Sequence, residues 1–306
     1  MLEVADQNLQ SSVDTGVIDS SFTTESAYIL PSDEPERQRL NEQSRFMTKA
    51  VFGGRLISVP SLTISPGDEI LESATGTGIW LLDLAHQLPL TISLTGIDIS
   101  TRLFPKPTTY PSNITFSSQS ITDLPPSWSN RFTLINQRLL TGALSKSQWI
   151  QALTEIFRVL KPGGWIQFME TGPTPNAYSG AKMKRMVDSW ALLYRARGLV
   201  PEIQDVLGQL ISETGFIEVQ KHIIPLPLSP RRDSSSLSDS ELDHYEEHKK
   251  NIIGFFVAAK QPFLMAGLFK GEVEFDQALE EMREEWDASE GCWWEWAIFY
   301  AKKPEC

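Results

Sequence analysis

The chain has 306 residues, of which 41% are hydrophobic and 22% are charged, a composition that favours a folded core and excludes a largely disordered protein. Its 39 acidic residues outnumber its 27 basic ones and give a formal net charge of -12, which argues against a broad nucleic-acid-binding or membrane-binding surface. The two cysteines, Cys292 and Cys306, have no metal-ligand spacing, and the N-terminus has neither a basic segment nor an apolar run. We therefore expect a cytoplasmic protein without a bound metal.

The first part of the chain is predicted to be a disordered tail followed by a helix. Residues 1–25 are rich in Ser, Thr, Asp and Gln and contain few apolar residues. The charged stretch 34–49 is predicted to be helical, because Pro35 suits a first turn and Gly53-Gly54 ends the helix shortly afterwards.

Strand and helix patterns then alternate along the chain, which is typical of a mostly parallel sheet covered on both faces. We expect an α/β fold, a Rossmann-like seven-stranded sheet with helical lid insertions at about 178–214 and 241–290. Strands are predicted at 68–73, 92–97, 113–117, 132–136, 165–170, 216–224 and 293–302. Helices are predicted at 79–87, 149–160, 181–197, 202–213, 241–268 and 275–288.

The segment Glu72-Ser73-Ala74-Thr75-Gly76-Thr77-Gly78 joins a predicted strand to a predicted helix. Its small residues allow a tight turn and a close approach of backbone amides to a ligand. Asp98, at the end of the next strand, stands where a carboxylate can accept both ribose hydroxyls of a nucleoside. These features predict a nucleotide-type cofactor and leave both a dinucleotide and S-adenosylmethionine (SAM) open.

The turn Leu160-Lys161-Pro162-Gly163-Gly164-Trp165 favours SAM, and here the chain resembles the class I SAM-dependent methyltransferases. Within them it is similar to the LaeA-like and gliotoxin-pathway N-methyltransferase-like group of fungal secondary metabolism. The resemblance runs from about residue 27 to the end of the chain. Its motifs are Tyr28–Asp33, Glu36, Arg39-Leu40, Gln43, Gly53–Leu56, Gly76–Trp80, Gly96–Ser100, Arg138–Leu140, Glu170, Gly215-Phe216 and Lys303-Pro304.

The resemblance implies one methyltransferase domain over 26–306, with SAM as cofactor. Residues 72–78 would wrap the methionine part, Asp98 would hold the ribose, and the fourth strand would end near the methyl group. Tyr28 and the 34–49 helix would close over the cofactor. The implied cofactor-binding residues are Tyr28, Glu72, Ser73, Ala74, Thr75, Gly76, Gly78, Asp98, Ile99, Ser120, Ile121, Asn136 and Gln137.

Three positions depart from the family pattern. One is Ser44, which stands where the family often has a histidine after Gln43. Ala74 stands where the first glycine is usual, and its methyl group could crowd the cofactor. Ser120 stands where an acidic residue usually faces the adenine, which would remove a charge-assisted hydrogen bond.

Glu170 and Arg138 are the candidate catalytic residues. Glu170 follows the fifth strand at the edge where such sheets place ligands, although it could equally cap a helix. His244 and His248 are one helical turn apart, a spacing that can bind zinc, but their charged neighbours favour a solvated helix face. Aromatic residues that could line a substrate pocket, or simply pack in the core, are Trp190, Tyr194, Phe255, Phe256, Trp293 and Trp294.

The sequence thus predicts a SAM-dependent methyltransferase that transfers a methyl group to a nitrogen or oxygen of a small natural product. Two alternatives stay open: a methyltransferase-fold protein without methyl transfer, such as a cyclase, and a LaeA-like regulator that acts through protein partners. The expected partner is a small-molecule substrate rather than a nucleic acid or a membrane, and the oligomeric state is open.

Overall fold

A computed structural model describes residues 29–173, 180–230 and 239–305. The predicted tail and Tyr28 lie outside these ranges. Among the described residues, no helix is both long enough and apolar enough to cross a bilayer.

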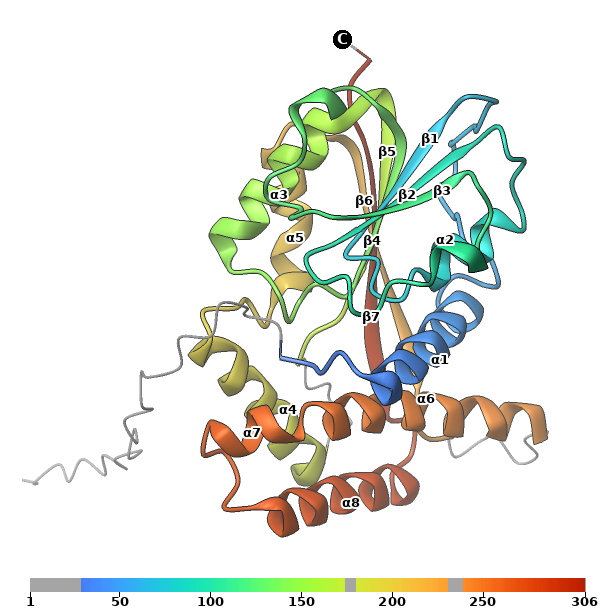
Figure 1. Cartoon of the computed structure of the whole chain (residues 1–306). Coiled ribbons are helices and arrows are strands. Elements are labelled where there is room, and N and C mark those ends of the chain that lie inside the picture. Colours follow the sequence, from blue (N-terminus) through green and yellow to red (C-terminus); the bar gives the residue numbers. More distant parts are fainter. Residues whose placement is uncertain (1–28, 174–179, 231–238, 306) are drawn as a thin grey trace, which may run out of the picture.

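A seven-stranded sheet runs through the upper part of the molecule in the order β3-β2-β1-β4-β5-β7-β6 (Figure 1). Only β7 runs antiparallel to its neighbours, so the predicted mostly parallel, Rossmann-like sheet is confirmed. The strands are β1 (Glu69–Ser73), β2 (Ser93–Asp98), β3 (Ile114–Ser118), β4 (Phe132–Arg138), β5 (Leu160–Glu170), β6 (Ile217–Pro227) and β7 (Trp293–Lys302).

The strand order reverses direction between β1 and β4. The chain passes from β1 outward to β2 and β3 and then returns to place β4 on the other side of β1. The loops that leave β1 and β4 therefore diverge at the carboxyl edge of the sheet. A crevice outside this edge is the usual ligand position in open α/β sheets.

Helices cover both faces of the sheet, and each face has its own apolar core. On one face, α3 (Lys146–Val159) and α5 (Ile203–Glu213) pack against the strands through a cluster that includes Trp149 and Phe299. On the other face lie α2 (Ile79–Ala85) and the second core, which extends to α1 (Glu34–Ala50) beneath the carboxyl edge of the sheet. Two short 3₁₀ turns, η1 (Pro107–Thr109) and η2 (Pro126–Trp128), complete this half.

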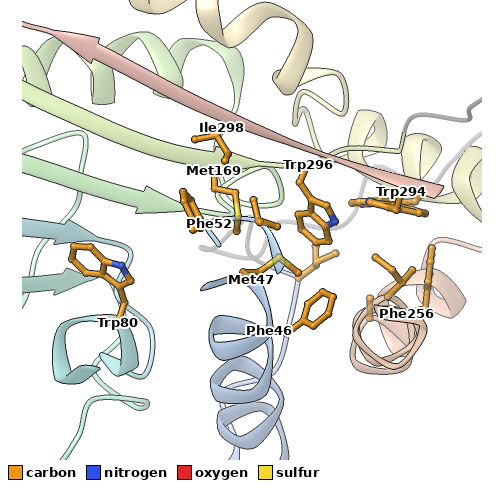
Figure 2. Close-up of a cluster of buried hydrophobic side chains, with 14 of the residues drawn as sticks. Phe46, Met47, Phe52, Trp80, Met169, Phe256, Trp294, Trp296 and Ile298 are labelled. Atoms are coloured by element: carbon orange, nitrogen blue, oxygen red, sulfur yellow. The ribbon is translucent and has the colours of Figure 1, made fainter. Parts of the chain in front are cut away.

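The remaining helices form a layer beyond the carboxyl edge of the sheet (Figure 1). They are α4 (Ala181–Ala196), α6 (Asp239–Ala258), α7 (Lys260–Met265) and α8 (Glu272–Ala288). In Figure 2, Phe46 and Met47 of α1 point toward Trp296 of β7, and Phe256 of α6 lies below Trp294. The four helices and α1 thus share one apolar core with β7. In contrast, α5 packs over one face of the sheet and is not part of the helical layer beyond its carboxyl edge, although α5 falls within the predicted 178–214 insertion.

Two predicted boundaries were wrong for identifiable reasons. The single helix expected over 241–268 ends at Ala258 and restarts as α7, because Pro262 has no N–H for Ala258 and its ring would clash with that carbonyl. Strand β5 begins at Leu160 rather than at 165, since Leu160 already pairs with Phe132 before an irregularity in the register.

Candidate functional site

The loop between β1 and α2 is a tight turn of left-handed residues. Ala74, Gly76 and Gly78 have φ values of 50°, 54° and 72°. At Gly78 a side chain is excluded, because an added Cβ would lie 2.5 Å from Phe116 Cζ. The turn is closed by the Gly78 N–H, which donates to the Thr75 carbonyl at 2.8 Å. This leaves a short, ordered loop that a ligand can approach closely.

Asp98, at the carboxyl end of β2, is tied directly to this loop. Its Oδ2 accepts the Gly76 N–H at 3.0 Å, and its Oδ1 accepts the Ser100 N–H at 3.0 Å. Burial raises the pKa of the Asp98 carboxyl above its ordinary value, although backbone hydrogen bonds oppose the shift. The carboxylate is thus held in place before any ligand binds.

Glu72 and Arg138 form a buried ion pair across β1 and β4. Arg138 Nη2 donates to Glu72 Oε1 at 3.3 Å, and Nη1 donates to Ser44 Oγ of α1 at 3.1 Å. Thr75 Oγ1 donates to Glu72 Oε2 at 2.5 Å. Burial raises the Glu72 pKa to about 7, although Arg138 and Thr75 oppose the shift. The pair fixes one positive and one negative group beside the glycine loop.

Helix α1 covers the loop from the other side. Thr77 Oγ1 donates to Asn41 Oδ1 at 2.6 Å, and Arg37 Nη1 donates to the Leu103 carbonyl at 2.7 Å. Its N-terminus is capped by Asp33, whose Oδ1 accepts the Glu36 N–H at 3.0 Å. The predicted helical cover is therefore docked on the loops that follow β1 and β2.

A cavity of about 720 Å³ extends from the glycine loop to the helical layer. A volume of this size falls in the range of roughly 300–1,000 Å³ that small-molecule sites occupy. Of the predicted site residues, those that line the cavity are Glu72, Ala74, Thr75, Gly76, Asp98, Ile99, Ser120, Ile121, Arg138, Trp190, Tyr194 and Phe255.

The far end of the cavity is aromatic. Trp190 and Tyr194 come from α4, Phe255 from α6, and Trp294 and Trp296 from β7. The two β7 tryptophans, labelled in Figure 2, are two residues apart on one strand and therefore share a face of the sheet. Trp296 did not emerge from the sequence as a site residue, although this spacing was the available signal.

Glu170 lies behind the cavity and not in its lining. It is completely buried, and its carboxylate accepts the N–H groups of Leu140 at 3.0 Å and Thr141 at 2.9 Å, and the Thr141 hydroxyl at 2.7 Å. Burial raises its pKa to about 7. The loop that it holds contains Leu139 at φ 60°, a strained value for a branched residue. This geometry fits a clamp of the loop rather than the predicted catalytic role.

Other predicted residues lie within the packing. Ser73 Oγ donates to Gln137 Oε1 at 2.9 Å, and Asn136 Oδ1 accepts from Gln167 Nε2 at 3.1 Å, so these side chains link strands inside the sheet. Gly78, Phe256 and Trp293 are also absent from the cavity lining, whereas Trp294 is part of it. Several lining residues were not predicted as site residues, among them Asn251, Thr141 and Thr171, and Gln43 appeared only as a motif of the family resemblance.

The expectation of a solvated face for His244 and His248 holds only for His244. His248 is 1% exposed and lies between Phe46, which stacks on it at 5.5 Å, and Trp296, whose Nε1 donates to His248 Nε2 at 3.3 Å. Its Nδ1 is 3.0 Å from the Pro227 carbonyl, so the ring carries its proton there. Burial lowers the His248 pKa to about 4. No metal-binding group of side chains occurs among the described residues.

Comparisons with known proteins agree with this geometry. A family model described as "Methyltransferase domain" matches residues 70–164. The chain is 29% identical over 281 residues to the N-methyltransferase sirN of Leptosphaeria maculans, covering 88% of this chain and 91% of the relative. It is 30% identical over 197 residues to the N-methyltransferase tcpN of Claviceps purpurea (strain 20.1), covering 62% of this chain and 69% of the relative.

Among solved structures, one similar chain is phosphoethanolamine N-methyltransferase 2 of Haemonchus contortus, in complex with phosphomonomethylethanolamine and S-adenosylhomocysteine. Its TM-score is 0.48 at 16% sequence identity, and the match covers 87% of this chain and 52% of that one.

Proposed function

Since the chain belongs to the SAM-dependent methyltransferase family, we propose that it methylates a nitrogen atom of a small natural product in fungal secondary metabolism. The observation that carries this proposal is the cavity itself. It joins the glycine loop and Asp98 at one end to an aromatic wall at the other, and so provides room for a cofactor and an acceptor in one space.

The residues at the first end suit SAM. Asp98 offers a fixed carboxylate to ribose hydroxyls, and the glycine loop offers backbone groups to the methionine part. The paired Glu72 and Arg138 line the same end, and their opposite charges would suit the amino and carboxylate groups of the methionine part. When bound, SAM supplies an electrophilic methyl group and leaves as S-adenosylhomocysteine.

Nitrogen is favoured because the acceptor end offers little help for removing a proton. Among the described residues that line the cavity, there is no histidine, lysine or cysteine, and the only carboxylates are Glu72 and Asp98 at the cofactor end. A neutral amine can attack a methyl group without prior deprotonation, whereas a hydroxyl usually needs a base of matched pKa. The printed names of sirN and tcpN, both N-methyltransferases, support the same atom.

The role of the protein is then to align the acceptor nitrogen with the methyl group of SAM and to enclose both. Holding a nucleophile and an electrophile at near-attack distance can supply about 7–11 kcal/mol of the barrier reduction in well-oriented systems. Here α1 covers the glycine loop. The aromatic wall holds the acceptor in line with the methyl group of SAM and excludes water. The proton that the methylated nitrogen loses passes to solvent after transfer.

The test is to incubate the protein with SAM carrying a deuterated methyl group and a metabolite extract of the producing organism. We expect one product whose mass increases by one labelled methyl group, with fragmentation placing the label on nitrogen. A label on oxygen would refute the choice of atom. Conversion of a metabolite that proceeds equally without SAM would instead support the cyclase-like alternative.

A further inference from the structure

We propose that the acceptor end of the cavity selects an uncharged aromatic ring system, which stacks on a wall formed by Trp190, Tyr194, Phe255, Trp294 and Trp296. This acceptor wall deepens the proposed function. The proposal rests on that function in one respect: it takes this end of the cavity as the acceptor site. It does not depend on which atom is methylated.

The rings of the acceptor wall hold one another in place. Trp190 and Trp294 are stacked, with centroids 5.7 Å apart and planes inclined by 17°. Phe255 lies 4.8 Å from Trp190, and Tyr194 meets Trp190 edge-on at 5.5 Å and 84°. Because Trp190 and Trp294 are each only 3% exposed, their orientations are fixed by packing before a ligand arrives. Flat, preorganised rings favour a ligand that is also flat.

The nitrogen atoms of the three indoles are buried, and two of them already donate to protein acceptors. Trp294 Nε1 donates to Thr171 Oγ1 at 2.8 Å, and Trp296 Nε1 donates to His248 Nε2 at 3.3 Å. Trp190 Nε1 is inaccessible to solvent and has no hydrogen-bond partner among the described residues. The indole surface that reaches the cavity is therefore mainly carbon, and a charged group placed against it would lose its hydration without an ionic partner.

The charged residues of the cavity lie on other elements. Glu72 and Arg138 are paired with each other, Asp98 is held by backbone N–H groups, and Arg102 follows β2. Arg39, which also lines the cavity, approaches α6 at Gly254, and its Nε and Nη2 donate to Glu36 at 2.7 Å each. Its Nη1 is buried and has no hydrogen-bond partner among the described residues.

Among the described residues, the cavity lining from α4, α6 and β7 contains no charged side chain. Behind the wall, His248 contacts Trp296 as a neutral ring, since burial holds its pKa at about 4. Neither the wall nor its backing therefore offers a charge to an ionic acceptor. The wall therefore favours an uncharged ring system over small zwitterions and phosphate-bearing amines.

Two pairs of probes separate charge from aromaticity. N-acetyltryptophanamide and tryptophan share the indole ring but differ in charge, while N-acetylleucinamide is uncharged and aliphatic. Each is titrated by calorimetry into the full-length protein saturated with S-adenosylhomocysteine. We expect N-acetyltryptophanamide to bind at least about tenfold more tightly than either of the others, a difference of about 1.4 kcal/mol. Equal affinities, tighter binding of tryptophan, or no binding of N-acetyltryptophanamide at millimolar concentration would overturn the proposal.

Variants locate the binding. Trp190→Leu and the milder Phe255→Leu should weaken N-acetyltryptophanamide binding by about tenfold, in line with the loss of a stacking partner. Trp190→Phe should recover most of it. Trp293→Leu is the matched control, because Trp293 lies next to Trp294 on β7 but is not part of the cavity lining. Unchanged affinity in Trp190→Leu and Phe255→Leu would refute the assignment.

The affinity for S-adenosylhomocysteine separates the two levels of the proposal. If every variant keeps this affinity while the probes show no preference, only the acceptor wall is refuted. If the wild-type protein itself does not bind S-adenosylhomocysteine, the proposed methyltransferase function is refuted together with the acceptor wall.

Discussion

Glu170 holds Thr141 through one carboxylate oxygen, Oε2, which accepts both the Thr141 N–H at 2.9 Å and the Thr141 hydroxyl at 2.7 Å. The same hydroxyl lies 2.7 Å from the carbonyl oxygen of Thr171. Thr171 in turn accepts the indole N–H of Trp294. A buried carboxylate therefore sets the position of the loop after β4 and, through two threonines, of one ring of the acceptor wall.

Replacing Glu170 by glutamine should separate catalysis from cofactor binding. The amide can accept through one atom only, and its NH₂ group would face backbone donors, so the clamp on the strained Leu139 loop weakens. We expect the free energy of unfolding to fall by about 1–3 kcal/mol. We also expect kcat to fall by about tenfold or more.

The affinity of Glu170→Gln for S-adenosylhomocysteine should stay at the wild-type value, because Glu170 does not line the cavity. Labelled methyl transfer and calorimetry measure the two quantities on the same sample. A variant with wild-type kcat would contradict the role of Glu170 as a positioning residue.

Much of the fold could be predicted because its signals are local. Alternating apolar strands and helices, the glycine turn and Asp98 all appear in short windows of sequence, and the predicted strand 293–302 coincides with β7. The role of Glu170 was not readable in this way, because its three donors come from a loop about thirty residues earlier, which only the pairing of β4 with β5 brings alongside.

The contacts of His248 could not be predicted for the same reason, because its partners are distant in sequence. Its sequence neighbours are charged and indicate a surface helix, but its partners Phe46, Pro227 and Trp296 come from α1, β6 and β7. No local pattern identifies such contacts. Similarly, Pro262 was visible in the sequence, but the apolar periodicity of 241–268 concealed the break that it causes.

The burial of neutral His248 predicts a specific loss of stability in acid. Its pKa is about 4 in the folded protein, below the ordinary 6.5, so the unfolded chain binds a proton there more readily. The contribution of His248 to stability is therefore complete above about pH 6.5 and decreases as the pH falls toward 4. A shift of this size corresponds to about 3 kcal/mol.

The comparison with His248→Gln isolates this effect, because Glu72 and Glu170 have raised pKa values of about 7 and contribute with the opposite sign between pH 4.5 and 7. We expect the stability advantage of the wild type over the variant to shrink as the pH falls from 6.5 to 4. Urea unfolding at several pH values measures it, and a constant difference would show that His248 titrates normally.

Ala74 should be one position where glycine stabilises the protein. Its φ of 50° is left-handed, a conformation that costs alanine roughly 1–2 kcal/mol and glycine almost nothing. Since glycine also increases the entropy of the unfolded chain, we expect Ala74→Gly to gain about 0.5–1 kcal/mol. Ala278→Gly, inside α8, is the control and should lose about 1 kcal/mol. Thermal unfolding compares them, and a loss of stability in Ala74→Gly would contradict the strain.

Ser120 offers a test in the direction of gained affinity. It lines the cavity, where its hydroxyl lies 2.8 Å from that of Thr122. The sequence resemblance implies that an acidic residue is usual at this position. Ser120→Asp should tighten SAM binding by about 1–3 kcal/mol through a charge-assisted hydrogen bond to the adenine amino group. Ser120→Asn should gain less because it carries no charge. Weaker binding in Ser120→Asp would place the adenine elsewhere.

SAM binding across the glycine loop and Asp98 is the premise of every step proposed for this site. Calorimetric titration of SAM into the wild type, Asp98→Asn and Asp98→Ala tests this directly, with thermal unfolding as the check that each variant is folded. We predict a wild-type Kd below about 1 mM, at least a tenfold loss in Asp98→Ala, and a smaller loss in Asp98→Asn, which keeps one acceptor oxygen. No binding by the wild type at millimolar SAM, or equal affinity in folded Asp98→Ala, would contradict it.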